Sequence, residues 1–474
     1  MGIKQVKIDV NEVTVGMFVS GLDRPWTQTP FPLQGFYVRD LTEIKELKIH
    51  CQHIYIDVVK GVAPVQSKLR KLHTPAKKIR RMERTEKSSK TFDVAPLAIR
   101  RDVYTEAAPL ESEIGRAKAL HQQVYDAVGL IMKQVEFDNR NVPIVETRRA
   151  ASQMVDSVIR SPDAFTWLGR VRDKDEYTYS HSVRSAIWAL LFGRHVGLPK
   201  EDLDVLAMAT LLKDIGKTKL PKSLLENDER TPAEQKEYEK FIGYGVDILR
   251  VLPEVKPRIT SVVKSHCERV NGSGFPSHLR GDKIPYLGKI AGIVTFYDET
   301  INPRGSDKPL SPSRAVAKLY ELRGIEFQDE LVIEFIRAIG LYPTGTLVAL
   351  SNGEVAVVVE QNFERRLKPK IMVVMDAVKQ TLSTPQFLDL AEIDKSNQAK
   401  IDSGKYTRGE IETLDIVQDL EPSAYDIDIE VIREAYLNRK TSGIGGIIGA
   451  DGLLSRFKNK VRLFPSGSKK ASKG

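Results

Sequence analysis

The stretch Leu211-Leu212-Lys213-Asp214-Ile215-Gly216-Lys217 decides the fold, because it closes an apolar helix that begins near Lys200 with a compact polar turn. Taken alone, this turn has an ordinary explanation, since glycine often ends a helix. Three further segments place polar residues within the mainly helical region, and we call all four the polar segments. They lie at residues 177–182 (Tyr-Thr-Tyr-Ser-His-Ser), 266–276 and 290–298. Each has an ordinary explanation by itself, but their order and spacing together are far less likely to arise by chance.

Helical patterning dominates residues 143–342, which we predict to form a helical domain. Thr231-Pro232-Ala233-Glu234 is a capping box with proline at the first helical position, and Ser311-Pro312 predicts a second helix start of this kind. Residues 105–142 carry apolar side chains at three- and four-residue steps, which predicts a connecting helix before this domain.

The N-terminal part differs from the helical middle. Residues 1–62 alternate apolar and polar side chains in short runs, which predicts a small α+β domain with a helix at about residues 41–47. Residues 63–104 lack an apolar period and contain proline, serine and many basic residues, so we predict a basic linker there.

The C-terminal part changes character again. Residues 343–395 contain three β-rich runs, two of them separated by a turn with Asn352-Gly353, which signals a hairpin. Residues 396–474 are polar and then glycine-rich, and we predict a flexible basic tail. The expected fold class is therefore mainly α: a helical domain preceded by a small α+β domain and followed by a small β unit.

Length and composition bound the class of protein. A chain of 474 residues is too long for one ordinary core, and 41% apolar with 28% charged residues suits a soluble globular protein. No apolar run approaches the length that crosses a bilayer, and no apolar signal region follows the first residues. Cys51 and Cys267 lie far apart in sequence, which favours a reducing compartment over a disulfide framework. We therefore expect a cytoplasmic protein.

The net charge of +9 is concentrated in two segments. Residues 68–90 hold ten lysines and arginines against two glutamates, and residues 456–473 hold seven basic residues and no acidic one. One interpretation is that both are solvated, flexible segments. The other is contact with an anionic surface such as a membrane. Aromatic side chains do not interleave with the basic ones, so we expect no nucleic-acid partner.

Taken together, the four polar segments resemble those of an HD-GYP domain, a class of HD-superfamily phosphodiesterases that hydrolyse cyclic di-GMP. The matching elements are the His-Ser pair at a helix start, the Asp-Ile-Gly-Lys turn, the His-x-Glu-Arg helix end and the Gly-x-Pro loop. The resemblance covers residues 143–342 and implies a helical HD-type domain. The flanking regions are similar to the small domain of unknown function that often precedes HD-GYP domains and to the β segment that often follows them.

This resemblance implies a centre of two or three iron-type ions held by His and Asp side chains, which activate water and neutralise phosphate oxygens. Three ligand positions are retained, at His181, Asp214 and His266. Four others are substituted, three of them by replacement of a family His and the last by replacement of a family Asp: Lys213, Phe241, Cys267 and Thr295.

The substitutions differ in their physical consequences. Phe241 offers no ligand atom and Thr295 offers at best a weak oxygen. The Lys213 ammonium repels a dication, and we predict that it pairs with Asp214 in the space of the missing ion. We expect no metal cofactor, unless Cys267 acts as a thiolate ligand. The remnant set would then hold one transition metal (iron, manganese or zinc): His181, Asp214, His266 and Cys267.

Positions that face the substrate in the family are better retained. Lys217 matches a family lysine that contacts phosphate, and Arg304 stands where the family has an arginine that contacts guanine or phosphate. Phe275 replaces the Tyr of the Gly-Tyr-Pro loop and keeps an aromatic face for a base. In an active phosphodiesterase, Asp214 and Lys217 would be the catalytic residues. The alternative interpretation of Lys217 and Arg304 is ordinary surface charge.

The resemblance leaves three hypotheses for function. The first is a degenerate HD-GYP protein of bacterial cyclic di-GMP signalling, which binds cyclic di-GMP or a partner such as a diguanylate cyclase (GGDEF) protein without hydrolysis. The second is an active metal-dependent cyclic di-GMP phosphodiesterase with an unusual metal set. The third is a module that uses its basic segments at an anionic membrane surface.

Overall fold

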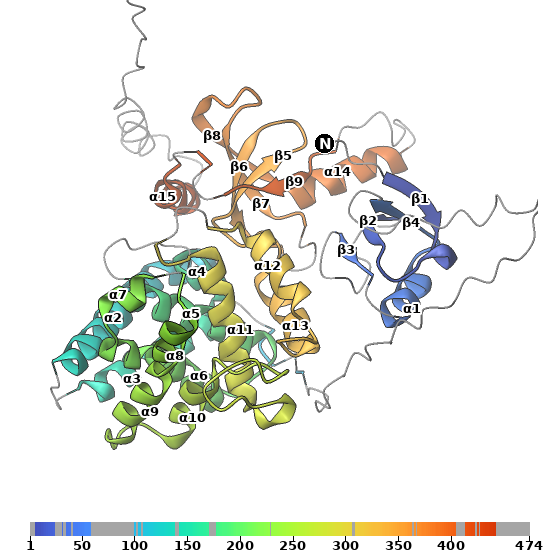
Figure 1. Cartoon of the computed structure of the whole chain (residues 1–474). Helices are drawn as coiled ribbons and strands as arrows, with labels where there is room; N and C mark the ends of the chain where they lie inside the picture. The colour runs from blue at the N-terminus through green and yellow to red at the C-terminus, as the bar shows by residue number, and fades with distance from the viewer. Residues whose placement is uncertain are drawn as a thin grey trace, which may run out of the picture. The chain divides into compact units, whose positions relative to one another are not determined.

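A computed structural model describes residues 5–23, 31, 35–38, 41–57, 99–100, 103–105, 108–137, 142–169, 177–227, 229–305, 309–362, 365, 367–403, 413–421, 424–425 and 427–441. Both basic segments, at residues 68–90 and 456–473, lie outside the described residues, as does most of the predicted linker. The chain divides into two compact units, residues 1–91 and 92–474 (Figure 1).

The first unit is the small α+β domain that the sequence predicts. Its antiparallel sheet has the order β1-β4-β2-β3, and Ile8, Ile54 and Ile56 of the β1–β4 pair are buried. One face of this sheet therefore forms the core. The elements are β1 (Gln5–Asp9), the 3-10 turn η1 (Val10–Glu12), β2 (Phe18–Leu22), β3 (Phe36–Tyr37), α1 (Leu41–His50) and β4 (His53–Asp57).

The second unit begins with the helical body, which confirms the mainly helical fold class. Its capping box is present, since Thr231 Oγ1 accepts a hydrogen bond from the Glu234 amide at 3.3 Å. The elements are α2 (Leu110–Glu136), α3 (Ile144–Arg160), α4 (Pro162–Leu168), α5 (Tyr177–His195), α6 (Lys200–Leu212), η3 (Ile215–Lys219), α7 (Lys222–Glu226), α8 (Pro232–Glu239), α9 (Phe241–Arg250), α10 (Pro257–Ser265), η4 (Gly281–Lys283), α11 (Tyr286–Ile301), α12 (Pro312–Glu321) and α13 (Asp329–Ile339).

Helix α2 belongs to this helical body. It packs against α3, α4 and α5. Near its first turn, the buried carboxylate of Glu113 accepts hydrogen bonds from Ser157 Oγ at 2.7 Å and from Arg160 Nη2 at 2.7 Å. The helix predicted within residues 105–142 is therefore present, and these contacts join it to the domain that follows.

A five-stranded sheet with the order β8-β7-β6-β5-β9 follows the helical body. The predicted hairpin is present, and Gly353 at its tip has a φ of 85°, a conformation that favours glycine. The predicted third strand is β7. The strands are β5 (Leu347–Leu350), β6 (Val355–Glu360), β7 (Lys370–Met375), β8 (Thr381–Asp389) and β9 (Ile416–Asp419).

The prediction of a flexible tail from residue 396 onward is wrong for the described residues 396–402, 416–419 and 429–441, which form helix and strand. Helix α14 (Leu390–Asp402) continues β8, and β9 pairs with β5. Helix α15 (Ile429–Thr441) buries Tyr436, whose hydroxyl donates to the Glu360 carboxylate. The strand is missed in the sequence because β9 is four residues long and buries one side chain, Ile416, so no alternating pattern develops. Residues 442–474 lie outside the described residues.

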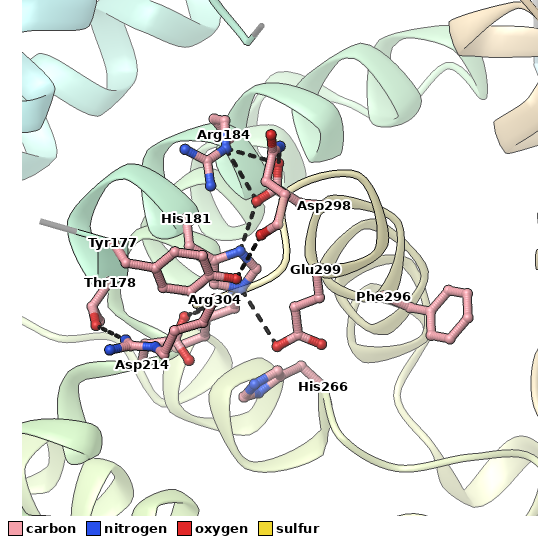
Figure 2. A network of polar contacts seen from close by, with 12 residues as sticks. Tyr177, Thr178, His181, Arg184, Asp214, His266, Phe296, Asp298, Glu299 and Arg304 are labelled. Carbon is pink, nitrogen blue, oxygen red and sulfur yellow. Dashed lines mark hydrogen bonds and ion pairs between the residues drawn. The ribbon is translucent and has the colours of Figure 1, made fainter. Parts of the chain in front are cut away.

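Packing within the helical body brings the polar segments together. Helix α5 packs against α6 and α11, while α10 packs against α6, α9 and α11. As a result, the start of α5, the turn after α6, the end of α10 and α11 converge, and they bring His181, Asp214, His266 and Asp298 together (Figure 2). Among the described residues, no helix is both long and apolar enough to cross a membrane.

Candidate functional site

The polar segments converge on one pocket, as the resemblance implies. The pocket has a volume of about 350 Å³. Asp214 and Lys217 come from the turn after α6, while His266 ends α10 and Thr295 lies on α11. All of the predicted substrate-facing residues line this pocket, and so do most of the predicted metal positions: Asp214, Lys217, Phe241, His266, Cys267, Phe275, Thr295 and Arg304.

Gly216 explains the shape of the Asp-Ile-Gly-Lys turn. A Cβ atom at Gly216 would lie 1.9 Å from the Phe241 carbonyl oxygen and 2.4 Å from the Gly245 amide nitrogen. The glycine is therefore required for the close approach of η3 to the start of α9. This contact places Lys217 beside the ring of Phe241, with 4.9 Å between the ammonium nitrogen and the ring centroid.

His181 is held between a carboxylate and an ammonium group. Its Nδ1 lies 2.7 Å from Asp298 Oδ2, and its Nε2 lies 2.7 Å from Lys213 Nζ. Because the ammonium can only donate, Nε2 is the acceptor and the Nδ1–H donates to Asp298. Burial, followed by the charge of Lys213, lowers the pKa of His181, so this ring is neutral at pH 7.

Asp298 anchors this arrangement from α11 (Figure 2). It accepts hydrogen bonds from Arg184 Nε at 3.0 Å and Trp188 Nε1 at 3.2 Å, in addition to the His181 bond. Burial opposes ionisation of this carboxyl, but Arg184 and then His181 outweigh burial and lower the pKa of Asp298. Asp298 is therefore ionised, and its carboxylate fixes the orientation of the His181 ring.

Asp214 lies between two lysines. The Lys213 ammonium contacts Asp214 Oδ2, and Lys217 Nζ lies 2.7 Å from Oδ1. All three side chains are buried, and although burial opposes ionisation, Lys213 and Lys217 hold the pKa of Asp214 well below its usual range. The pairing of Lys213 with Asp214 that the sequence predicts is thus present.

These contacts decide whether the residues fit a metal centre of the kind that the family uses. The Lys213 nitrogen lies within contact distance of both His181 Nε2 and Asp214 Oδ2, the two ligand atoms that would share an ion. An ammonium at that point repels a dication and occupies the lone pair of His181 Nε2. Among the described residues, no group of three or more His, Cys, Asp or Glu side chains is arranged to hold an ion. The residues present do not fit a two- or three-ion centre.

The other predicted metal positions are apolar in their surroundings. Phe241 is 1% exposed and belongs to a hydrophobic cluster with Leu220, Leu224 and Ile242, against which Cys267 packs. Burial raises the pKa of the Cys267 thiol to about 12. The thiol is therefore protonated at pH 7, which disfavours it as a thiolate ligand.

His266 differs from His181 because one of its nitrogens has an open side. Its Nδ1–H donates to the Val263 carbonyl oxygen at 2.8 Å, so Nε2 carries the lone pair. Among the described residues, this buried Nε2 and the hydroxyl of Thr295 have no hydrogen-bond partner. Both residues line the pocket, so a bound molecule has an acceptor and a hydroxyl within it.

We expect acid to destabilise the fold through His266. Burial lowers its pKa to about 3, whereas histidine in an unfolded chain titrates near 6.5. Between these values the unfolded state binds one more proton than the folded state. The free energy of unfolding therefore decreases as the pH is lowered, by up to about 1.4 kcal/mol per pH unit from this residue. Urea titrations of the wild type between about pH 7 and 5 measure this slope.

The matched variants for this measurement are His266→Asn and His278→Asn. His278 is exposed, so its replacement should leave the pH slope of the wild type. His266→Asn should flatten the slope by about one proton equivalent. An unchanged slope in His266→Asn contradicts the assignment of a buried neutral imidazole.

The Gly-x-Pro loop is fixed by Glu268, the acidic residue of the His-x-Glu-Arg segment. Its carboxylate accepts hydrogen bonds from the Ser277 amide at 2.8 Å and from the Leu279 amide at 2.9 Å. A Cβ at Gly274 would lie 2.3 Å from the Cys267 carbonyl oxygen, so only glycine permits this approach. The loop thereby places the Phe275 ring against Phe241, with 6.2 Å between centroids.

Arg304 lies at the pocket wall in a defined position (Figure 2). Its guanidinium carbon is 4.5 Å from the centroid of the Tyr177 ring, and its Nη2 donates to Thr178 Oγ1 at 2.5 Å. Glu299 also lines the pocket and has an oxygen 3.7 Å from His181 Nε2. Arg304 is therefore a half-buried cation that lines the pocket and is held by Tyr177 and Thr178.

Sequence reasoning did not assign roles to several residues of this site. Asp298 stands three positions after Thr295, on the same face of α11, and this spacing was a usable signal. The roles of Arg184 and Glu299 depend on packing between α5 and α11, which no local pattern reports. Arg230 and Tyr238 also line the pocket, from the segment around α8.

Comparison with protein families gives three matches along the chain. A domain of unknown function matches residues 5–142, an HD domain matches residues 170–331, and a KOW domain associated with HD domains matches residues 347–406. Their order agrees with the order of modules predicted from the sequence.

Among curated proteins, the chain is similar to a cyclic di-GMP phosphodiesterase of Pseudomonas aeruginosa, with 27% identity over 83% of this chain and 90% of that protein. It is also similar to a 3'3'-cGAMP-specific phosphodiesterase of Vibrio cholerae, with 27% identity over 41% of this chain and 36% of that protein. A solved HDG"Y"P protein from Bdellovibrio bacteriovorus aligns with a TM-score of 0.41 and 15% identity, over 70% of this chain and 98% of that one. The family comparison confirms the predicted HD domain, and the curated relatives are cyclic dinucleotide phosphodiesterases.

Proposed function

Since the chain carries an HD domain between a domain of unknown function and a KOW domain, and is similar to cyclic dinucleotide phosphodiesterases, we propose that it binds a cyclic dinucleotide without metal and without hydrolysis. In this proposal the domain acts as a receptor in cyclic di-GMP signalling.

The position of Lys213 carries the proposal. Its ammonium contacts His181 Nε2 and Asp214 Oδ2, so a fixed positive charge of the chain takes the place of an exchangeable ion. A metal-bound hydroxide is the nucleophile of metal-assisted hydrolysis, and an ammonium cannot supply one. Its charge still favours an anion nearby, because the electrostatic interaction is strong in a buried site.

The rest of the pocket supports binding of a nucleotide. Arg304 and Lys217 provide cationic donors for phosphate oxygens, and Phe275 with Phe241 provides an aromatic surface for a base. Thr295 Oγ1 and His266 Nε2 add polar atoms deeper in the pocket. A concave site with an aromatic lining and a few convergent polar groups is the usual form of a small-molecule site.

The proposal is tested by equilibrium binding of labelled cyclic di-GMP and 3'3'-cGAMP to the full chain in the presence of a chelator. We expect saturable binding of at least one of them, with a Kd that changes by less than about twofold when the chelator is replaced by iron or manganese. We also expect no linear dinucleotide or GMP after prolonged incubation with either metal.

Two variants complete this experiment. Arg304→Gln should weaken binding about tenfold or more, because it removes a charge-assisted contact to phosphate. Arg250→Gln is the matched control, since Arg250 is 65% exposed at the end of α9 and does not line the pocket. Binding that requires metal, or hydrolysis stimulated by metal, would overturn the proposal.

A second candidate, a one-metal phosphodiesterase, is favoured by a single observation. His266 Nε2 is buried, has no hydrogen-bond partner among the described residues and lines the pocket, which suits a metal ligand. Metal analysis of the purified chain tests it, because this candidate requires about one transition-metal ion per chain. A diguanylate cyclase partner and a membrane surface both stay predictions, and the basic segments lie outside the described residues.

A further inference from the structure

We infer that Arg230 is a second phosphate-binding residue of this pocket, so that the pocket selects a ligand with two separated phosphates. Together with Arg304, it would hold one phosphate at each of two walls. This inference rests on the proposed function and names the feature that separates a cyclic dinucleotide from a mononucleotide.

Arg230 is held in a defined orientation at the pocket. Its guanidinium carbon lies 4.0 Å from the centroid of the Tyr238 ring, and its Nε donates to the Leu224 carbonyl oxygen at 3.1 Å. With one face on the tyrosine and Nε in use, its terminal Nη atoms are the donors left for a ligand. Both Arg230 and Tyr238 line the pocket.

This construction repeats that of Arg304 on other elements. Arg304 follows α11 and stacks on Tyr177 at the start of α5, whereas Arg230 precedes α8 and stacks on Tyr238 within that helix. In each pair a tyrosine ring covers one face of the guanidinium and limits its rotation. An orientated guanidinium loses less conformational entropy when it binds phosphate through two donors.

The two arginines also differ from the other cations of the pocket in their charge balance. Lys217 shares the Asp214 carboxylate with Lys213, at 2.7 Å from Oδ1, and Arg269 lies 3.6 Å from a Glu326 oxygen. Neither Arg230 nor Arg304 forms an ion pair with a carboxylate among the residues that the structure describes.

Glu234, one turn after Arg230, is engaged elsewhere. Glu234 accepts hydrogen bonds from the amide and the hydroxyl of Thr231 in the capping box. Two guanidiniums at one pocket without a direct ion pair among the described residues match a ligand that carries two negative charges.

The size of the pocket agrees with this division. A volume of about 350 Å³ is near the lower end of the range for small-molecule sites, about 300 to 1,000 Å³. It suits one nucleotide unit inside, with the second unit across the mouth. A mononucleotide would then engage one arginine, and a cyclic dinucleotide would engage both.

The test compares Arg230→Gln with the wild-type full chain in titrations with cyclic di-GMP and with GMP at two salt concentrations. We expect Arg230→Gln to weaken binding of cyclic di-GMP by about 10- to 100-fold, the loss of one charge-assisted phosphate contact. GMP binding should change by less than about threefold, since GMP engages the Arg304 side. The salt dependence of cyclic di-GMP binding should also become shallower, because one fewer charge is neutralised.

Controls separate a local effect from a folding defect. Arg250→Gln should bind as the wild type does, and circular dichroism melts should show that Arg230→Gln keeps the wild-type Tm. Arg230→Lys keeps the charge and should recover part of the lost affinity, which a purely structural role in stacking would not do.

Three outcomes overturn the inference. The first is unchanged cyclic di-GMP affinity in Arg230→Gln, while Arg304→Gln loses affinity. The second is an equal loss for cyclic di-GMP and GMP, which indicates a general effect on the pocket. The third is a wild-type chain that binds neither cyclic dinucleotide, and this result alone also removes the proposed function.

Discussion

The variant Lys213→His is expected to gain a transition-metal ion that the wild type does not hold. The variant replaces the ammonium between His181 and Asp214 with an imidazole, at a position where the resemblance to HD-GYP domains implies a ligand. His181 Nε2 and Asp214 Oδ2 lie 3.7 Å apart, so the new imidazole would bring three ligand side chains to one place. We expect about one zinc, iron or manganese per chain in the variant.

The measurement is elemental analysis of both proteins after purification and metal loading. Lys213→Gln is the control, because it removes the ammonium without adding a ligand, and it should stay near the wild-type metal content. A second ion is not expected in Lys213→His, since Phe241 still fills its own position with a buried ring. Equal metal content in the wild type and in Lys213→His would contradict the assignment of Lys213 as the internal cation.

Asp214→Asn is expected to lose a large part of the stability of the helical domain. Its carboxylate contacts the ammonium groups of Lys213 and Lys217, and all three side chains are buried. Without the negative charge, two buried cations face each other uncompensated. Breaking a buried ion pair on one side costs about 3 to 5 kcal/mol.

Chemical unfolding with a tertiary-structure probe measures this loss. Asp247→Asn is the matched control, because Asp247 is 74% exposed and lies 3.6 Å from Arg250, and exposed pairs contribute at most about 1 kcal/mol. If Asp214 instead lay among other acidic ligands without a metal ion or a lysine, its removal would relieve repulsion and stabilise the fold. An Asp214→Asn variant as stable as the wild type, or more stable, would therefore contradict the described ion pairs.

Much of the fold follows from local sequence. The bounds of α5 and α6, the capping box of α8 and the β5–β6 hairpin agree with what capping residues, apolar periodicity and the Asn-Gly turn predict. The region after residue 395 was predicted wrongly because β9 and α15 depend on partners elsewhere. Strand β9 pairs with β5 across a long separation in sequence, and α15 packs on β6.

The candidate site was likewise predictable from the sequence only in part. Residue identities alone established that Phe241 offers no ligand atom and that Lys213 brings a cation to a metal position. They did not establish that Asp298 holds His181, because this contact joins α11 to α5. They also did not establish that Arg230 stacks on Tyr238, which joins the residues just before α8 to that helix.

The Leu211–Lys217 stretch shows where this boundary lies. By itself it determined a helix end, a retained carboxylate and a lysine in place of a histidine, since these are properties of single positions and short spacings. Only the tertiary structure decided that the lysine nitrogen lies 2.7 Å from His181 on a different helix, and that Gly216 lets η3 meet α9. Such distances depend on how helices pack, and packing is set by side chains far apart in the sequence.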